Sequence, residues 1–240
     1  MKRLLLASVV VLATFTQANA AIITQWNFNT FPVPQVADTA TGTLVPSIGS
    51  GTVSTFNGTT QLFASGAANG GSSDPATFDN SGLQITTFAA QDGTARGVQF
   101  AVSTLGQSGI TVNWDHRFSN TSSRGSQFLY SVDGSTFTSF GTVPNATGGD
   151  AWFNVRSIDL TSVSAVNNNA NFAFRILQLP TALNGTSFEA ANPTGTYGGG
   201  TWRFDMVTVT AVPEPSSMAL LGVIGVAGVV ARRRRAATKA

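Results

Sequence analysis

The sequence contains no cysteine, and its two lysines, Lys2 and Lys239, lie next to the ends of the 240-residue chain. Without disulfides, an exported domain has to rely on a buried core or a metal ion for its stability. Between residues 21 and 211, six arginines stand against ten acidic residues, a net charge of about −4. Because no basic stripe is left to contact a phosphate backbone, nucleic-acid binding is disfavoured.

Histidine and glutamate are almost as scarce. His116 is the single histidine, so a histidine-based zinc site lacks ligands, and no G-x-S-x-G motif accompanies it. Residues 21–211 hold one glutamate, Glu189, whereas glycoside hydrolysis needs two carboxyl groups at a set separation. A pair of aspartates such as Asp115 and Asp205 stays open as an alternative. We expect no catalytic residues.

The N-terminus has the order of a secretory signal peptide. Lys2 and Arg3 precede an apolar segment over residues 4–14, which is too short for a stable membrane span. Small residues mark the cleavage site: Ala18, Ala20 and Ala21. The sequence therefore predicts export through the Sec translocon, with residues 1–20 removed by signal peptidase.

The C-terminus has three segments in a fixed order. The first is the turn-forming sequence of Val212, Pro213, Glu214 and Pro215. An apolar run over residues 216–231 follows, predicting a transmembrane helix, which is short against the roughly 20 residues that span a bilayer. Cationic residues complete the segment: Arg232, Arg233, Arg234 and Arg235. The positive-inside bias places these arginines and the tail over 236–240 in the cytoplasm.

In all three parts, residues 212–240 resemble the PEP-CTERM sorting signal. That resemblance implies recognition by exosortase, a membrane-embedded transpeptidase-like enzyme that is thought to cleave near the Pro-Glu-Pro and remove the helix. Pro213 and Pro215 keep the backbone extended, and a protease recognises an extended peptide more readily than a helix. The alternative is a permanent single-pass anchor in the inner membrane.

The segment over residues 21–211 has the composition and periodicity of an all-β domain. Alternation of apolar and polar residues predicts strands at 22–29, 97–103, 110–118, 126–132, 136–140, 151–158, 171–179 and 201–210. Asp133-Gly134 favours a hairpin turn, and a bulge near Asp205 or Met206 would restore alternation in the last strand. Residues 159–166 predict a short helical turn capped by Asp159. We expect a single jelly-roll-like β-sandwich.

Residues 114–209 also resemble bacterial jelly-roll modules. The resemblance rests on the hairpin sequence over 130–137 and on the closing strand over 202–205. The relatives of these modules include carbohydrate-binding domains. Three aromatic residues at strand starts or in loops are candidates for stacking on a sugar: Trp152, Tyr197 and Trp202. Packing in the core is the alternative for each of them.

Calcium is the one metal ion that the composition suits, because its ligands are oxygen atoms. Jelly-roll modules often hold a structural ion where the first and last strands meet. The candidate ligands are Asn27, Asp79 and Asp205. No EF-hand spacing is present, and solvated turn residues are the alternative.

Together these features predict an exported, non-enzymatic protein of the cell envelope or extracellular matrix. It would be anchored in the inner membrane as a precursor and then sorted by exosortase. Its role would be structural or adhesive, with exopolysaccharide as the candidate ligand. A secreted enzyme acting on polysaccharide is the alternative.

The processing model predicts the intact mass of the protein recovered from the envelope and the medium. We expect a chain that begins at Ala21 and ends between residues 213 and 217. A mass that retains residues 232–240 would contradict sorting and identify the helix as a lasting anchor.

Overall fold

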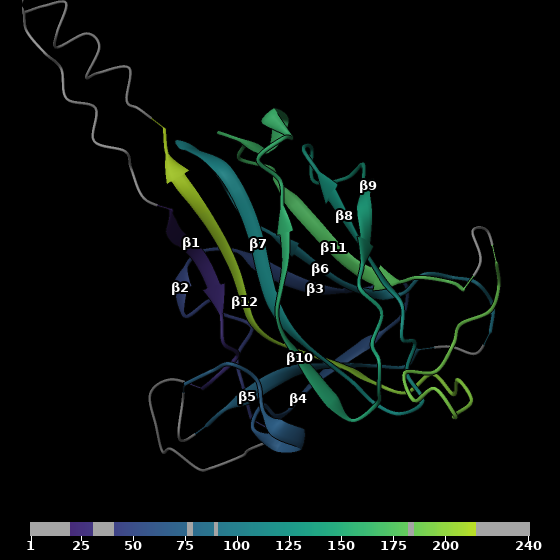
Figure 1. The fold of residues 1–240 in the computed structure, drawn as a ribbon. Coiled ribbons are helices and arrows are strands. Elements are labelled where there is room, and N and C mark those ends of the chain that lie inside the picture. The colour runs from purple at the N-terminus through teal and green to yellow at the C-terminus, as the bar shows by residue number, and fades with distance from the viewer. Residues whose placement is uncertain (1–19, 31–40, 76–78, 89–90, 182–184, 215–240) are drawn as a thin grey trace, which may run out of the picture.

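Two antiparallel β-sheets stacked on each other form the domain (Figure 1). The structure is a computed structural model, and it describes residues 20–30, 41–75, 79–88, 91–181 and 185–214. The larger sheet contains β1 (Ala21–Trp26), β2 (Ile48–Gly49), β4 (Thr60–Ser65), β5 (Ser81–Thr86), β7 (Gln107–Phe118), β10 (Ala151–Asp159) and β12 (Trp202–Pro213). The smaller sheet contains β3 (Thr52–Phe56), β6 (Gly97–Ala101), β8 (Ser126–Ser131), β9 (Thr138–Val143) and β11 (Ala173–Gln178). The prediction of an all-β sandwich is confirmed.

Strand β12 organises the larger sheet. The strand order is β10-β7-β12-β1-β2, and β5 pairs with β12 while β4 pairs with β5. On one side, β12 pairs with β7 from Trp202 to Pro213. On the other side it pairs first with β5 and then, from Val207 onward, with β1. The smaller sheet has the order β3-β6-β11-β8-β9.

The alternation in β7 shows why this sequence forms a strand with one apolar face. Its inward side chains are at most 1% exposed, and they are Ile110, Val112, Trp114, His116 and Phe118. The predicted strand over 110–118 is confirmed, and the ladder to β12 extends it back to Gln107. These inward side chains share one face because successive side chains of a strand point to opposite faces of a sheet. On the other face, Asp115 and Arg117 are also buried, at 1% and 8% exposed.

A continuous row of aromatic rings joins the two sheets. Neighbouring centroids are 5.0–6.0 Å apart along Trp26, Phe100, Phe174, Phe128 and Trp114. The two tryptophans come from the larger sheet and the phenylalanines from the smaller one. Because the sequence has no cysteine, this core supplies stability that disulfides give to many exported domains. Truncating one such phenylalanine to alanine typically costs about 3–5 kcal/mol.

The predicted bulge in the last strand is present. The register of β12 against β7 shifts between Asp205 and Thr208, and Met206 has a φ of 47°. The extra residue turns both Phe204 and Val207 toward the core, where each is 0% exposed. A side chain in the left-handed region is costly, so the surrounding sheet has to hold Met206 in place.

The predicted hairpin joins β8 and β9. Asp133 Oδ1 accepts hydrogen bonds from the backbone N–H groups of Ser135 (2.8 Å) and Thr136 (2.6 Å). Gly134 has a φ of 76°, which a glycine adopts without strain. The bonds to the Asp133 carboxylate also lower its pKa below the usual range.

Two parts of the sequence-based prediction were wrong. Strands β2, β3, β4 and β5, all between residues 48 and 86, were not predicted. The turn expected over 159–166 is reduced to a short 3-10 turn, η2 (Ser164–Val166), whose preceding residue is Val163. Asp159 does not cap it and instead accepts a hydrogen bond from the Thr161 N–H at 2.8 Å. Short polar side chains often make such local turns.

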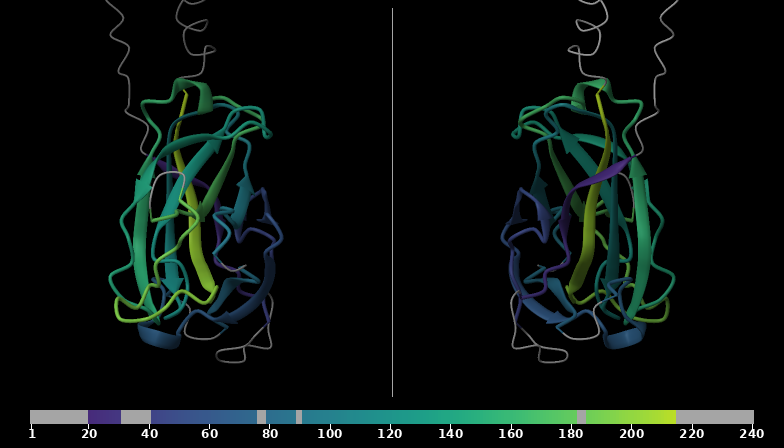
Figure 2. Two further views of the ribbon diagram at one scale, coloured as in Figure 1. Left: turned by 90° about the vertical axis from the view of Figure 1, so that its right-hand side faces the viewer. Right: turned by 90° about the vertical axis from the view of Figure 1, so that its left-hand side faces the viewer.

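The strap, which we define as residues 66–75, crosses the outer face of the larger sheet. It contains a second 3-10 turn, η1 (Ala68–Gly70). The Trp152 indole N–H donates to the carbonyl of Ala68 at 2.8 Å, and the Asn154 amide donates to that of Gly71 at 3.1 Å. Figures 1 and 2 place η1 at the end of the sandwich opposite the point where β12 ends.

His116 lies on the inner face of β7, where the alternation over residues 110–118 places it. Its ring is 0% exposed and packs against Phe118, Phe204 and Trp202 at centroid distances of 3.8, 4.4 and 4.7 Å. Within the described part of the chain, neither ring nitrogen has a hydrogen-bond partner. Burial and the nearby Arg156 guanidinium hold the pKa of His116 well below its usual range. The ring is therefore neutral in the folded protein.

We expect His116→Phe to reduce the sensitivity of the fold to acid. The unfolded chain takes up a proton on His116 near pH 6.5 while the folded chain does not, so the free energy of unfolding falls below that pH. The loss can reach about 1.4 kcal/mol per pH unit. Urea unfolding at about pH 7 and about pH 5 measures it, and phenylalanine should remove this part of the loss. Equal losses in both proteins would contradict a neutral buried ring.

Candidate functional site

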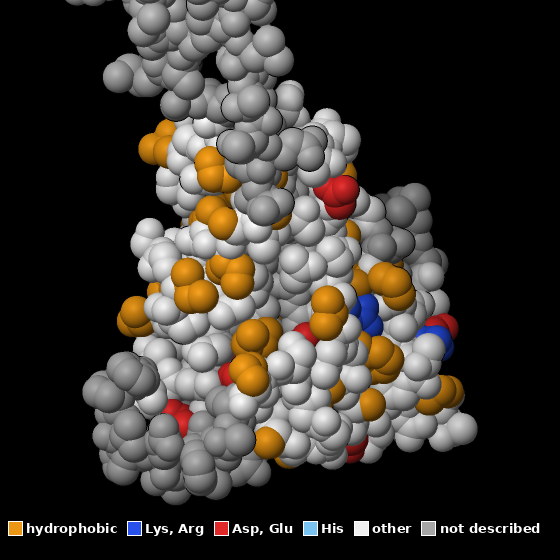
Figure 3. Space-filling view, turned by 60° about the vertical axis from the view of Figure 1, so that its left-hand side comes forward, with side chains coloured by type: hydrophobic (Ala, Val, Ile, Leu, Met, Phe, Trp, Pro, Cys, Tyr) orange, Lys and Arg blue, Asp and Glu red, His pale blue; other side chains and the backbone are white. Residues whose placement is uncertain are grey.

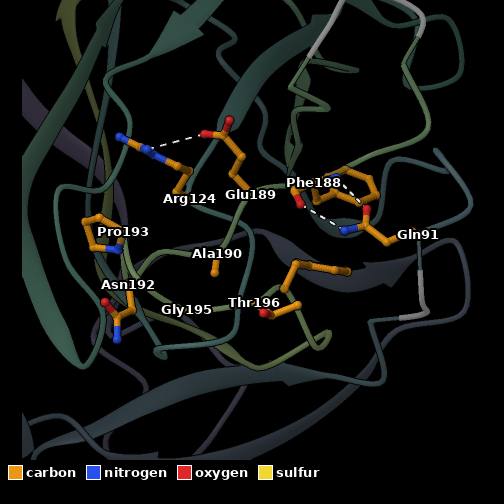
Figure 4. Close-up of a pocket in the computed structure, with 10 residues that line it drawn as sticks. Gln91, Arg124, Phe188, Glu189, Ala190, Asn192, Pro193, Gly195 and Thr196 are labelled. Carbon is orange, nitrogen blue, oxygen red and sulfur yellow. Dashed lines mark hydrogen bonds and ion pairs between the residues drawn. The ribbon is translucent and has the colours of Figure 1, made fainter.

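A pocket of about 410 Å³ lies among loops at one end of the sandwich (Figure 4). Most of its wall is the segment over residues 188–197, and Gln91 and Arg124 complete it. This segment leads into the start of β12, whereas the sorting signal continues from the other end of that strand. The twelve residues of β12 therefore lie between the pocket segment and Glu214, about 40 Å at the usual rise of a strand.

The pocket segment is fixed to the β7–β8 connection by backbone hydrogen bonds. Ser123 and Ala190 form an isolated antiparallel bridge. Backbone hydrogen bonds of 2.8–3.0 Å continue the pairing, from Arg124 N–H to Glu189 O, from Ala191 N–H to Ser122 O and from Asn192 N–H to Asn120 O. The wall of the pocket therefore resembles a pair of antiparallel strands, although the sequence of this segment predicts a loop.

Gln91 and two aromatic rings form the inner part of the wall. The Gln91 amide donates to the carbonyl of Phe188 at 2.9 Å, and its oxygen accepts the Phe188 N–H at 2.5 Å. The rings of Phe188 and Tyr197 lie 5.2 Å apart. The Gln178 amide donates to the Tyr197 hydroxyl at 3.0 Å, and burial raises the pKa of that hydroxyl. The phenol therefore stays protonated at neutral pH.

Exposed polar groups form the rim. Arg124 Nη1 lies 3.3 Å from Glu189 Oε2, and the two side chains are 30% and 53% exposed. Figure 4 shows this ion pair on one side of the pocket, with Asn192 and Thr196 on another. The rim thus offers a cation, an anion, an amide and a hydroxyl beside an aromatic wall. This mixture suits a ligand with many hydroxyl groups.

The structure places the three aromatic candidates in different surroundings. Tyr197 lines the pocket and is 8% exposed. Trp202 is 0% exposed in the core, where its indole N–H donates to the Ser123 carbonyl at 3.0 Å, so it supports the pocket segment rather than a ligand. Trp152 is half-buried under the strap. The three rings do not form one platform.

The candidate calcium ligands are engaged with the protein itself. Asp79 Oδ2 accepts the Thr30 N–H at 2.7 Å, and Asn27 Oδ1 accepts the Asn29 N–H at 3.4 Å. Asp205 accepts the Ser72 hydroxyl at 2.6 Å and the Met206 N–H at 2.7 Å. Among the described residues, no group of three or more His, Cys, Asp or Glu side chains is placed to hold a metal ion. The calcium site stays a prediction.

Two aspartates lie side by side beneath the strap. Asp115 of β7 and Asp205 of β12 are cross-strand partners on the outer face of the sheet, 1% and 0% exposed. Burial, together with nearby Asp74 and Asp115, raises the pKa of Asp205 well above its usual range. Asp115 accepts two backbone N–H groups, from Ser73 at 2.5 Å and Val155 at 2.7 Å. All four carboxyl oxygens are thus occupied within the fold.

Two arginines of the same outer face bind the strap and the residues beside it. Arg117 donates to Asn69 Oδ1 at 3.1 Å and to Asp150 Oδ1 at 2.6 Å. Arg203 donates to the carbonyl of Ser65 and, at 2.7 Å, to Gln84 Oε1. Both guanidinium side chains are 8% exposed as residues. Polar groups that are buried in this way stabilise a fold only when each finds a partner.

The exposed surface drawn in Figure 3 carries few charged side chains. Its hydrophobic side chains lie in separate groups among polar atoms. Dispersed apolar residues of this kind are ordinary on a protein surface and do not indicate a docking patch. The pocket is therefore the better candidate for a binding site.

The structure describes the first part of the sorting motif. Val212 and Pro213 belong to β12, and the Glu214 N–H donates to the carbonyl of Gly106 at 3.0 Å. At the other end of the chain, Ala20 is exposed and Ala21 begins β1. The remaining predicted residues of both signals lie outside the described residues: Ala18, Pro215, Arg232, Arg233, Arg234 and Arg235.

The predicted transmembrane helix over 216–231 also lies outside the described residues. Among the helices that the structure describes, none has the length and apolar character needed to cross a membrane.

Comparison with known proteins identifies one motif. Residues 211–235 match the PEP-CTERM protein-sorting motif, which confirms the sequence-based prediction of this signal. The motif marks the protein as one that is exported and sorted by exosortase. No curated protein matches the chain.

Several solved structures with a similar fold are carbohydrate-binding modules. The tandem of two family 22 modules from Paenibacillus barcinonensis aligns with a TM-score of 0.48 and 11% identity over 80% of this chain, which spans half of the tandem's length. The C-terminal family 22 module of a Clostridium thermocellum protein aligns with a TM-score of 0.41 and 13% identity, over 80% of this chain and 95% of the module. A xylan-binding domain of the same family gives 0.42 and 14%, with the same coverage. At these values, function has to be argued from the residues of this chain.

The two aspartates beneath the strap should respond oppositely to the same substitution. Asp205→Asn removes a carboxylate whose charged form is disfavoured by burial, so we expect a higher melting temperature at neutral pH, about 2–4 °C for each kcal/mol gained. The gain should vanish at low pH, where Asp205 is protonated, since a raised pKa costs stability only as the pH rises.

Asp115→Asn is the matched comparison. Its new NH₂ group would face a backbone N–H of Ser73 or Val155, so we expect a loss of about 1–3 kcal/mol in the free energy of unfolding. Chemical denaturation of the two variants measures both effects. Equal destabilisation by both substitutions would show that Asp205 needs its charge.

Proposed function

We propose that the protein is an exported, non-enzymatic component of the cell envelope or extracellular matrix, and that its β-sandwich binds polysaccharide in the loop pocket. Residues 1–20 act as the signal peptide and 21–211 as the ectodomain. Residues 212–235 act as the sorting segment, and 236–240 as a cytoplasmic tail. The partners in this proposal are the Sec translocon, signal peptidase, exosortase and the inner membrane, with exopolysaccharide as the ligand.

The pocket carries the proposal. Its volume of about 410 Å³ lies within the range of about 300–1,000 Å³ that is usual for small-ligand sites. The exposed rim groups donate and accept hydrogen bonds, as sugar hydroxyls do. Tyr197 and Phe188, which are 8% and 3% exposed, form the aromatic inner wall and offer a small apolar contact to a sugar ring.

The position of the pocket supports a binding role on an anchored precursor. The pocket segment precedes β12, whereas the sorting signal occupies the last residues of that strand and continues beyond it, so most of the strand separates the two. A polymer outside the cell can therefore reach the pocket while the predicted helix over 216–231 still lies in the membrane.

The carboxylates favour binding over catalysis. Glu189 is the one carboxylate of the pocket wall, and it faces Arg124, whereas glycoside hydrolysis requires two carboxyl groups across the scissile bond. The alternative pair, Asp115 and Asp205, is buried and hydrogen-bonded to the strap and to neighbouring backbone. Neither arrangement supports hydrolysis.

Calorimetric titration with three soluble polysaccharides tests the proposal. The probes are xylan, alginate and the exopolysaccharide extracted from the source bacterium. Glu189→Gln keeps the shape of the pocket and removes a charged acceptor, so we expect it to weaken binding by about 10- to 100-fold.

The matched control is Asp159→Asn, which also removes one exposed carboxylate, from the last residue of β10. It should bind like the wild type. Absence of binding to all three probes, or equal effects of the two substitutions, would contradict a polysaccharide site in this pocket. Release of reducing sugar ends by the wild type would contradict the proposal that the protein is not an enzyme.

A further inference from the structure

The sorting motif and the folded domain overlap in the chain. The motif begins at residue 211, and β12 continues to Pro213. Val212 is the cross-strand partner of Ser108, and Pro213 is the partner of Gln107. The Ser108 hydroxyl also donates to the carbonyl of Val212 at 3.3 Å. An extended peptide is therefore present, as the prolines predict, but it is paired with a neighbouring strand.

The segment that holds the motif is itself fixed. The Glu214 N–H donates to the carbonyl of Gly106, and the Gly106 N–H donates to Asn168 Oδ1 at 2.8 Å. The Asn168 N–H donates in turn to the carbonyl of Gln107 at 2.8 Å. Asn168 lies just beyond η2, so the motif is tied through residues 106–107 to a third part of the chain.

The pairing of residues 212–214 with residues 106–108 hinders cleavage of the peptide bonds within it. An enzyme that cleaves peptide bonds binds its substrate as a detached strand, so bonds inside a sheet react only in proportion to the fraction of molecules in which they are open. Residues 211–214 would have to leave β7 and the residue 106 carbonyl before any bond among them could enter an active site.

We propose that the folded sandwich sets the N-terminal limit of exosortase processing, so that cleavage falls after Glu214. The mature protein then keeps Val212 and Pro213 as the end of β12, followed by Glu214. In this step one peptide bond breaks, its acyl group passes to water or to an acceptor amine, and the departing tail takes the proton on its new amino group. This inference rests on the sorting role in the proposed function.

A cross-strand disulfide tests the proposal directly. Ser108 and Val212 are cross-strand partners, whose Cα atoms in a sheet lie within the range of about 4.4–6.8 Å that a disulfide spans. Because the sequence has no cysteine, the double variant Ser108→Cys with Val212→Cys can form a single bridge. The full-length precursor is produced in a bacterium that carries exosortase, and mature masses are measured.

We expect the cross-linked variant to be processed within about twofold of the wild-type rate and to give a product that retains residues 212–214. Slower processing, by about tenfold or more, would overturn the proposal if both single-cysteine variants are processed normally. A wild-type product that ends before Glu214 would overturn it too. If the wild type keeps residues 232–240, the sorting role itself fails, and this inference fails with it.

Hydrogen exchange gives a measurement that does not depend on exosortase. In the purified protein, the Glu214 amide should exchange at least about tenfold more slowly than an unstructured amide. Asn168→Gly preserves the φ of 46° at that position but removes the acceptor of the Gly106 N–H, so it should reduce the protection. Unprotected exchange at Glu214 in the wild type would overturn the proposal even if processing is normal.

Discussion

The pairing of β7 with β12 is the interaction on which the rest of the molecule depends. One face of this pair supplies His116, Phe204 and the other core residues, and the opposite face supplies the aspartates that receive the strap. The pocket segment enters at one end of β12, and the sorting motif leaves at the other. Core, strap, pocket and motif are therefore positioned by a single ladder.

The two faces of the β7–β12 pair are stabilised by different interactions. The inner face excludes water by packing aromatic rings, which compensates for the absence of disulfides. The outer face buries carboxyl and guanidinium groups, which is tolerable because each carboxyl oxygen of Asp115 and Asp205 accepts a hydrogen bond. Such a layer makes the position of the strap specific, since a shifted strap would leave these groups unpaired.

Periodicity in the sequence predicted the strands in which apolar and polar side chains alternate. It predicted the strand containing His116, the hairpin at Asp133 and the bulge beside Asp205, because each depends on the order of neighbouring residues. The strands between residues 48 and 86 were missed. Of these, β5 has an inward pair, Leu83 and Ile85, that could have signalled it, whereas the two-residue β2 has no pattern to read.

The sequence by itself determined the C-terminal sorting motif, the all-β class and the burial of His116, because charge order and alternation are local properties of the chain. Only the tertiary structure decided which of the candidate aromatic residues lines the pocket. Tyr197 lines a pocket whereas Trp202 is enclosed, and nothing in their flanking residues distinguishes them. The tertiary structure also decided that Glu214 is paired with Gly106, more than a hundred residues away in the chain. Contacts between segments that are distant in the chain depend on how the strands pair and the sheets pack. Short-range sequence patterns do not specify that arrangement.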